Sequence, residues 1–309
     1  MDLALKGKSV VVTGGNRGIG RGIAVALAQE GCDLVLTGTD EAALKQAAAA
    51  VTAHGRKAKT VAIDLRKNEA PAALLDAAKS AYGRLDILVN NAGTTKRGDF
   101  MTLTDADWAE GYALKFFAHV RLVRAAWPLL KASGGSLVSI GGTSGRVPTA
   151  GFTIGSSVNA AVAAFSKALA DLGKTEGVQV NCIHPSYVDT ERFARRVKAD
   201  MERTGQSEAE VREWHRKAQT IRRPAKRALV LAATALVVMP DLPLLFAKAL
   251  SPVRAAPVHT AQFVCNVPAA AAALNRLTPA TVFAPIDNGP MLLLTTGHKV
   301  VATAHHRAP

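Results

Sequence analysis

Glycine dominates residues 13–20, whose sequence is TGGNRGIG. Glycine lets the chain turn tightly and approach a pyrophosphate with no Cβ in the way. A helix that begins at such a turn directs free N–H groups and the positive end of its dipole to the same point. The order of apolar strand, glycine turn and helix therefore predicts a phosphate-binding turn for a dinucleotide. The residues that we expect to contact the dinucleotide here are Gly14, Asn16, Arg17, Gly18, Ile19 and Gly20.

The end of the second apolar run bears on which dinucleotide binds. A site that selects NAD carries an acid at this tip to bind the adenosine ribose hydroxyls. Gly38 occupies the position where that acid is expected, and Thr39 follows it. With no acid there and Arg17 in the glycine turn, a 2′-phosphate is accepted better than at an NAD site. We therefore predict NADP, with Thr39 beside the adenosine ribose, while Asp40 leaves NAD open as the alternative.

Two later strand ends carry residues that can border the same cofactor. Asp64 and Leu65 follow the third apolar run, where a carboxylate can accept a hydrogen bond from the adenine amino group. Asn90, Ala92 and Gly93 follow the fourth run, where small residues and backbone groups can approach the cofactor. Each set alone could be purely structural. Their recurrence at successive strand ends favours a single binding edge.

Strands and helices must alternate for these motifs to meet. Apolar, β-branched runs of strand length occupy residues 9–13, 33–37, 60–63, 87–89, 136–140 and 178–183. Helix-length stretches rich in Ala, Leu and Lys occupy residues 21–30, 41–54, 70–82 and 159–174. This alternation predicts an α/β fold, in which a parallel sheet is covered by helices on both faces. Residues 191–217 form a charged helical region that we expect over the carboxyl edge of the sheet.

These motifs, with residues 181–185 (NCIHP) and Thr190, resemble the short-chain dehydrogenase/reductase family over residues 5–220. The resemblance implies a Rossmann-type doubly wound sheet and hydride transfer between a nicotinamide cofactor and a small carbonyl or alcohol substrate. It also implies that Pro185, Val188 and Thr190 lie over the nicotinamide carboxamide. Family members form homo-oligomers, an expectation that the altered C-terminal part of this chain puts in doubt.

The family's catalytic residues are missing from this chain. The family uses a tyrosine as general acid/base, a lysine four residues later, a serine and an asparagine. The register set by residues 157–170 places Gly155 at the tyrosine position and Asn159 at the lysine position. The serine position, roughly thirteen residues before the tyrosine, falls at Gly142, and the asparagine position, reached through Trp108, falls at Lys115. No tyrosine of the chain precedes a lysine by four residues in this region, so no shift of register restores the pair.

Lys115 can compensate for the missing groups, because burial and charged neighbours readily lower a lysine pKa. We hypothesise that Lys115, with Thr143 or Asn159, polarises the substrate and transfers the proton. The alternatives for Lys115 are that it faces solvent or only binds an anionic substrate or the cofactor. The alternatives for the chain are a catalytically inactive dinucleotide-binding protein and a fusion product with impaired activity.

The net charge of +14 would by itself suggest nucleic acid or an anionic membrane. No nucleic-acid motif accompanies it, so we expect no nucleic-acid partner. Basic residues are concentrated in 195–227, and their excess in the helical region 191–217 hints at an anionic or polar substrate. The three cysteines match no metal-ligand spacing, and the histidines near the C-terminus have no acidic partners, so we expect no metal.

The chain changes character near residue 228, after which Asp241 and Asp287 are the only acids. The apolar segment 228–250 exceeds the roughly 20 residues that cross a bilayer, but Asp241 and two prolines interrupt it. It is either a buried helix with a Pro-rich loop or a membrane span that anchors a cytoplasmic domain. We predict three parts: a dinucleotide-binding domain 1–227, the segment 228–250, and an appendage 251–309 in which the family's last strand is missing or replaced. This tail weakly resembles the C-terminal end of polytopic bacterial membrane proteins.

Overall fold

The computed structural model describes residues 3–218, 281–285 and 299–303. The chain divides into two compact units, Met1–Lys248 and Ala249–Pro309, and each is described by itself. The predicted boundaries at residues 227 and 250 and the apolar segment 228–250 lie outside the described residues, so they stay predictions. No helix among the described residues is both long enough and apolar enough to cross a bilayer.

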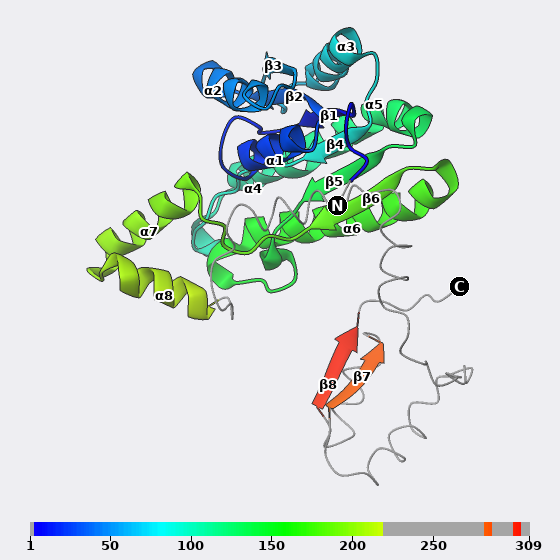
Figure 1. Ribbon diagram of the computed structural model, residues 1–309. Coiled ribbons are helices and arrows are strands. Elements are labelled where there is room, and N and C mark those ends of the chain that lie inside the picture. The colour runs from blue at the N-terminus through cyan, green and yellow to red at the C-terminus, as the bar shows by residue number, and fades with distance from the viewer. Residues whose placement is uncertain (1–2, 219–280, 286–298, 304–309) are drawn as a thin grey trace, which may run out of the picture. The chain divides into compact units, whose positions relative to one another are not determined.

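A parallel six-stranded sheet forms the centre of the first unit (Figure 1). Its strands are β1 (Ser9–Val12), β2 (Asp33–Gly38), β3 (Ala58–Ala62), β4 (Ile87–Asn90), β5 (Ser136–Ile140) and β6 (Gln179–Ile183). Their order in the sheet is β3-β2-β1-β4-β5-β6. Strands β1 to β3 are added toward one edge of the sheet and β4 to β6 toward the other, so the order of strand addition reverses between β1 and β4. Ligands of open α/β sheets bind at such a switch point. The predicted doubly wound α/β fold is confirmed.

Helices cover both faces of the sheet. Successive side chains of each strand point to opposite faces, so each strand contributes to two core clusters. Val10 and Val12 face the core cluster that contains residues of α1 (Gly18–Gln29) and α2 (Glu41–Thr52). Val11 faces the opposite cluster, which contains residues of three further helices. These helices are α3 (Ala70–Tyr82), α5 (Ala118–Ser133) and α6 (Thr153–Glu176). All three strand valines are fully buried.

Short helical elements connect strands β4 and β5 to the long helices that follow them. α4 (Asp105–Tyr112) continues through a π-helical turn, η2 (Ala113–Phe117), into α5. Two 3-10 turns, η3 (Thr143–Gly145) and η4 (Ala150–Phe152), connect β5 to α6, and η1 (Phe100–Thr102) precedes α4. Single π-helical turns are frequent at functional sites, because the inserted residue redirects side chains out of the regular helical register.

Two helices follow β6, α7 (Glu191–Thr204) and α8 (Glu208–Ala218), and we call them the lid helices. The charged region 191–217, predicted to be helical, forms these two helices. They pack on each other through a small core of Phe193, Val197 and Val211. Figure 1 shows them standing apart from the helices that cover the sheet.

The second unit contains a two-stranded parallel sheet of β7 (Thr281–Pro285) and β8 (Lys299–Thr303). Within the described residues β6 pairs only with β5, so no seventh strand extends the main sheet there. Residues 219–280 lie outside the described residues, so the expectation that the family's last strand is missing or replaced stays a prediction.

Candidate cofactor and catalytic site

The glycine turn between β1 and α1 is held by close backbone packing. Gly14 has φ +61° and Gly18 has φ +54°, backbone conformations that favour glycine. A Cβ atom on Gly20 would overlap the carbonyl oxygen of Gly14. Asn91 ties the turn to β4, because its Nδ2 donates to the carbonyl oxygens of Thr13 at 2.8 Å and Gly14 at 3.2 Å. The open N-terminus of α1 thus faces a fixed backbone cradle.

The two asparagines at the end of β4 have different surroundings. Asn90 is fully buried in the core and its two side-chain polar atoms have no partner among the described residues. Asn91 instead reaches the turn, and Thr13 Oγ1 accepts from the backbone N–H groups of Asn91 at 2.8 Å and Ala92 at 3.0 Å. Neighbouring residues of a strand point to opposite sides, which separates the surroundings of these two asparagines.

The tip of β2 has no room for an acid. A Cβ atom on Gly38 would lie 2.7 Å from Cγ of Asn16, whose side chain covers this glycine. Asp40 caps α2, where its Oδ1 accepts from a backbone N–H at 3.0 Å. Thr39, which follows this tip, is exposed, and so is Arg17 in the glycine turn. The only acid that the sequence offered for ribose hydroxyls is therefore engaged as a helix cap.

Three other predicted cofactor residues, Asp64, Leu65 and Ile19, differ in their surroundings. Asp64 pairs with Arg66 at 2.6 Å, and this hydrogen-bonded partner holds the pKa of the carboxyl below its usual range. Leu65 is buried in the core cluster beneath α3, and Ile19 packs against the other cluster. Leu65 and Ile19 thus support the edge through packing, and Asp64 is the polar group at this position.

Lys115 lies on the π-helical turn and points into the carboxyl edge of the sheet. Its Nζ donates to the carbonyl oxygen of Gly141 at 3.2 Å, just beyond β5. Its stem crosses Gly93, where a Cβ atom would lie 2.7 Å from Lys115 Cγ. Burial, together with the Arg192 guanidinium, lowers the pKa of Lys115 from 10.5 to about 8. The alternative in which Lys115 faces solvent therefore does not describe this structure.

Asn159 occupies the family's lysine position and is buried against the end of β5. Its Nδ2 donates to Ser144 Oγ at 2.9 Å, and it lies so close to Gly142 that a Cβ there would be 2.8 Å away. Its Oδ1 is buried without a hydrogen-bond partner. Thr143 connects neighbouring loops, because its backbone N–H donates to the carbonyl oxygen of Pro185 at 3.1 Å. Ser144, which the sequence reasoning missed, is thus the hydroxyl bonded to Asn159.

An aromatic ring fills the family's tyrosine position. The ring of Phe152 lies where a Cβ atom on Gly155 would stand, so no larger residue fits without movement of that ring. The guanidinium of Arg97 stacks on the same ring, with Cζ 3.6 Å from its centroid. This arrangement has no direct signal in the sequence, because Phe152 lies three residues before the aligned position.

His184 is a further site residue that the sequence reasoning did not select. Its Nδ1 lies 3.3 Å from the carbonyl oxygen of Gly142, which can only accept, so Nδ1 carries the proton. Burial lowers the pKa of His184, and Arg146 and Lys115 lower it further. The imidazole is therefore neutral at pH 7, and its Nε2 is free to act as an acceptor.

A fully buried histidine, His119, contacts the loop that follows β4. His119 Nε2 lies 2.8 Å from the carbonyl oxygen of Ala92 and must donate to it. The side chain is 2% exposed, and burial lowers its pKa to about 4. His119 is therefore neutral, and its second ring nitrogen is left without a partner among the described residues.

The segment after β6 is anchored to the lid helices. Thr190 caps α7, with Oγ1 accepting from Phe193 N at 3.4 Å, and Val188 is buried. The ring of Tyr187 stacks on Phe193, and its hydroxyl lies 3.1 Å from Nδ1 of the fully buried His215. The loop that the family resemblance places over the nicotinamide is therefore fixed to α7 and α8.

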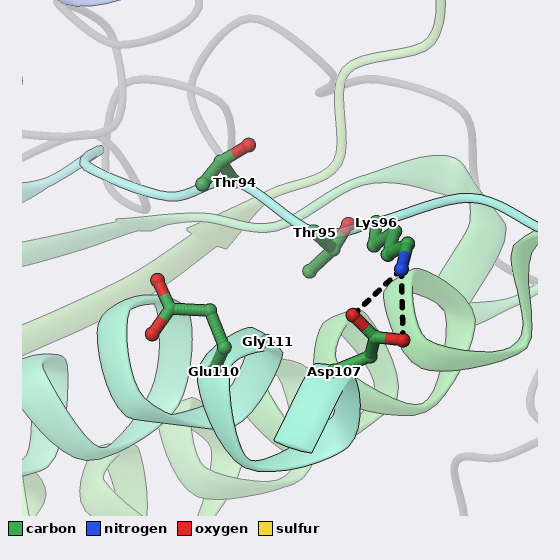
Figure 2. A pocket seen from close by; sticks show the side chains of 6 residues that line it. All are labelled: Thr94, Thr95, Lys96, Asp107, Glu110 and Gly111. Atoms are coloured by element: carbon green, nitrogen blue, oxygen red, sulfur yellow. Dashed lines mark hydrogen bonds and ion pairs between the residues drawn. The ribbon is translucent and has the colours of Figure 1, made fainter. Parts of the chain in front are cut away.

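A cavity of about 270 Å³ lies between the loop after β4 and α4 (Figure 2). It is lined by Thr94, Thr95, Lys96, Asp107, Glu110 and Gly111. Lys96 pairs with Asp107 at 2.8 Å, and Glu110 pairs with Arg66. None of the predicted site residues lines this cavity, and its charged side chains are engaged in ion pairs.

No group of three or more potential metal ligands occurs within residues 3–218 or the two short strands of the second unit. The histidines at 298, 305 and 306 lie outside the described residues.

The sheet order, the glycine cradle and the open helix N-terminus define the dinucleotide-binding class of α/β proteins. The chain belongs to the short chain dehydrogenase family, whose model matches residues 8–201. An uncharacterized oxidoreductase from Mycobacterium tuberculosis is 37% identical over 188 residues, which cover 60% of this chain and 71% of the relative.

Solved structures agree with this membership. L-sorbose reductase from Gluconobacter frateurii, complexed with NADPH and L-sorbose, matches with a TM-score of 0.74 and 29% identity, over 78% of this chain and 94% of that one. A short chain dehydrogenase from Burkholderia cenocepacia, in complex with NADP, matches with a TM-score of 0.67 and 32% identity, over 77% of this chain and 93% of that one.

Proposed function

We propose that the protein is an NADP-dependent oxidoreductase that interconverts a carbonyl compound and an alcohol with a catalytic set unlike that of its family. The observation that carries this proposal is the position of Lys115. Its ammonium is turned into the carboxyl edge of the sheet, it bonds the carbonyl oxygen of Gly141, and its pKa is lowered to about 8. A general acid works best when its pKa lies near the working pH.

The residues present fit a bound dinucleotide. The backbone cradle around Gly14 and Gly20 leaves no space for side chains and directs the N–H groups of α1 outward, as pyrophosphate binding requires. The buried, unpartnered Oδ1 of Asn159 is suited to accept a ribose hydroxyl, which would stand in for the family's lysine. An orphaned buried acceptor costs free energy, so a ligand hydroxyl there would be favourable.

NADP is favoured over NAD by the tip of β2. Asn16 covers Gly38, the Asp40 carboxylate caps α2, and Arg17 is exposed to meet a 2′-phosphate. The similar structures with NADPH and NADP support the same choice.

When bound, the cofactor supplies or accepts the hydride. In the reduction direction, Lys115 Nζ donates its proton to the carbonyl oxygen of the substrate as that oxygen gains negative charge. The carbonyl group of Gly141 holds the ammonium in place. His184 presents a neutral Nε2 nearby and can accept a proton from solvent for return to Lys115. The proton lost from Nζ is thus replaced, and the substrate gains one proton with the hydride.

Each departure from the family pattern packs closely against a neighbouring residue. Gly142 makes room for the amide of Asn159, Gly155 makes room for the ring of Phe152, and Gly93 makes room for the Lys115 stem. Random loss of catalytic residues would leave voids or clashes at some of these places. The close fit supports a rebuilt site over a decayed one.

The experiment is an NADPH titration of the full chain, followed by NADPH oxidation with a panel of aldehydes and ketones. Saturable binding with turnover of at least one compound supports the proposal. Binding without turnover of any compound would favour the catalytically inactive dinucleotide-binding protein, and absent binding would favour an impaired fusion product.

A further inference from the structure

Three arginines, Arg97, Arg192 and Arg196, interact electrostatically with one another, and one of them lies on the ring that replaces the family's tyrosine. Arg97 comes from the loop after β4, and Arg192 and Arg196 come from the first turns of α7. The Arg97 guanidinium stacks on Phe152, with Cζ 3.6 Å from the ring centroid. Arg192 Nη1 donates a long hydrogen bond of 3.4 Å to the carbonyl oxygen of Gly93, the residue that the Lys115 stem crosses. The cluster therefore stands next to the proposed acid.

The positive charge of this cluster is poorly compensated. Among the described residues, neither Arg97 nor Arg192 forms an ion pair with a carboxylate. Asp200, which acts on Arg97 and pairs with Arg196 at 3.7 Å, is shared with His215 at 2.9 Å and Arg203 at 3.0 Å.

The charges of the cluster act on one another. Partial burial lowers the pKa of Arg192, and Arg17, Arg195 and Arg196 lower it further. Partial burial likewise lowers the pKa of Arg97, with added contributions from Arg196 and Arg192. Cations brought together in this way are stabilised when an anion binds among them.

We propose that Arg97, Arg192 and Arg196 form a subsite for an anionic group, carboxylate or phosphate, on the carbonyl substrate. This inference rests on the proposed oxidoreductase function and adds the class of substrate to it. The planar guanidinium of Arg97, held flat on Phe152, presents its N–H donors in the fork that binds two oxygens of one anion. The subsite spans the loop after β4 and the lid helix α7, so a bound anion would draw the two together.

The probes are straight-chain oxo acids, each paired with its uncharged methyl ester, beginning with levulinate and methyl levulinate. Their affinity for the full chain is measured by isothermal titration calorimetry, with and without saturating NADP⁺. The variants are Arg97→Gln and Arg192→Gln. The matched control is Lys198→Gln, which removes one positive charge from the same helix at a side chain that is 79% exposed.

The wild type should bind at least one oxo acid more tightly than its ester in the presence of NADP⁺. Arg97→Gln and Arg192→Gln should each weaken binding of that acid by about tenfold or more while leaving the ester unchanged. Lys198→Gln should change neither by more than about twofold.

Equal affinity for acids and esters in the wild type would overturn the proposal. So would loss of acid binding on addition of NADP⁺, since that result assigns the arginines to the cofactor phosphates. The readout does not need turnover. Acid binding without NADPH oxidation would refute the proposed oxidoreductase and leave the subsite standing, whereas turnover of neutral compounds without acid binding would do the reverse.

Discussion

Replacing Lys115 with methionine tests the proposed acid directly. Methionine keeps an unbranched stem beside Gly93 and removes the ammonium group that donates to the carbonyl oxygen of Gly141. The change should abolish most of the proton transfer without opening a cavity. Lys167→Met is the matched control, because Lys167 is exposed and pairs only with a neighbouring aspartate on α6.

The magnitude follows from the pKa of the lysine. A fall from 10.5 in the unfolded chain to about 8 in the folded protein means that folding disfavours the charged form by about 3 kcal/mol. Between these two values the unfolded chain binds more protons than the folded protein, so this residue makes stability rise with pH across that interval. At pH 7 the charged lysine is a net cost. After allowance for the lost hydrogen bond, Lys115→Met should be roughly 1–2 kcal/mol more stable than the wild type there.

Two assays read out these effects. Urea unfolding between pH 7 and 10.5 should give a wild-type stability that rises from about pH 8 upward relative to Lys115→Met. The pH profile of kcat/KM for carbonyl reduction should fall in the wild type above about pH 8, where Lys115 loses its proton. The variant should retain NADPH binding but lose about 10²- to 10⁴-fold in kcat/KM, with that fall absent.

The reasoning fails if the two proteins show the same dependence of stability on pH, since Lys115 would then have an ordinary pKa. Equal rates of NADPH oxidation would refute the catalytic role even with the pKa confirmed. Lys167→Met should match the wild type in both assays, which excludes a general effect of removing one positive charge.

Three further predictions concern the residues that position the site. Gly93→Ala should displace the Lys115 stem, 2.7 Å from the new Cβ, and lower kcat about tenfold or more in a steady-state assay, whereas Gly151→Ala, with open space around it, should not. Gly20→Ala should collide with the turn carbonyl, which we expect to weaken NADPH binding in a fluorescence titration and destabilise the fold by about 1–3 kcal/mol. His119→Leu should weaken the loss of stability at acid pH. The folded wild type keeps this histidine neutral down to about pH 4, whereas the unfolded chain protonates it near pH 6.5. Urea unfolding should therefore show a loss of up to about 3 kcal/mol between pH 6.5 and 4 in the wild type that is absent from the variant.

Local sequence signals were sufficient for most of the fold. The strand at 136–140 and the helix at 70–82 were placed to the residue, because β-branched runs and Ala-rich stretches are bounded by glycine or polar turns. The glycine turn was also readable, since its role depends on three consecutive local elements. The inward direction of Lys115 could be hypothesised from its alignment with the family's asparagine.

Residues that act through tertiary packing could not be identified in this way. The ring of Phe152 replaces the tyrosine from three residues away, and Ser144 Oγ accepts a hydrogen bond from Asn159. His184 gives no periodic or motif signal, and its role follows only from its contact with the Gly142 carbonyl. Such substitutions across space leave no trace in the order of residues along the chain.

The central claim is that a short chain dehydrogenase without the family's tyrosine still transfers hydride. The most direct test incubates the full chain with carbonyl compounds, oxo acids included, and NADPH deuterated at both C4 positions, and then weighs the alcohol product by mass spectrometry. We predict one deuterium in the alcohol formed by the wild type and at least tenfold less of it with Lys115→Met. Saturable NADPH binding with no deuterium in any product would contradict the claim.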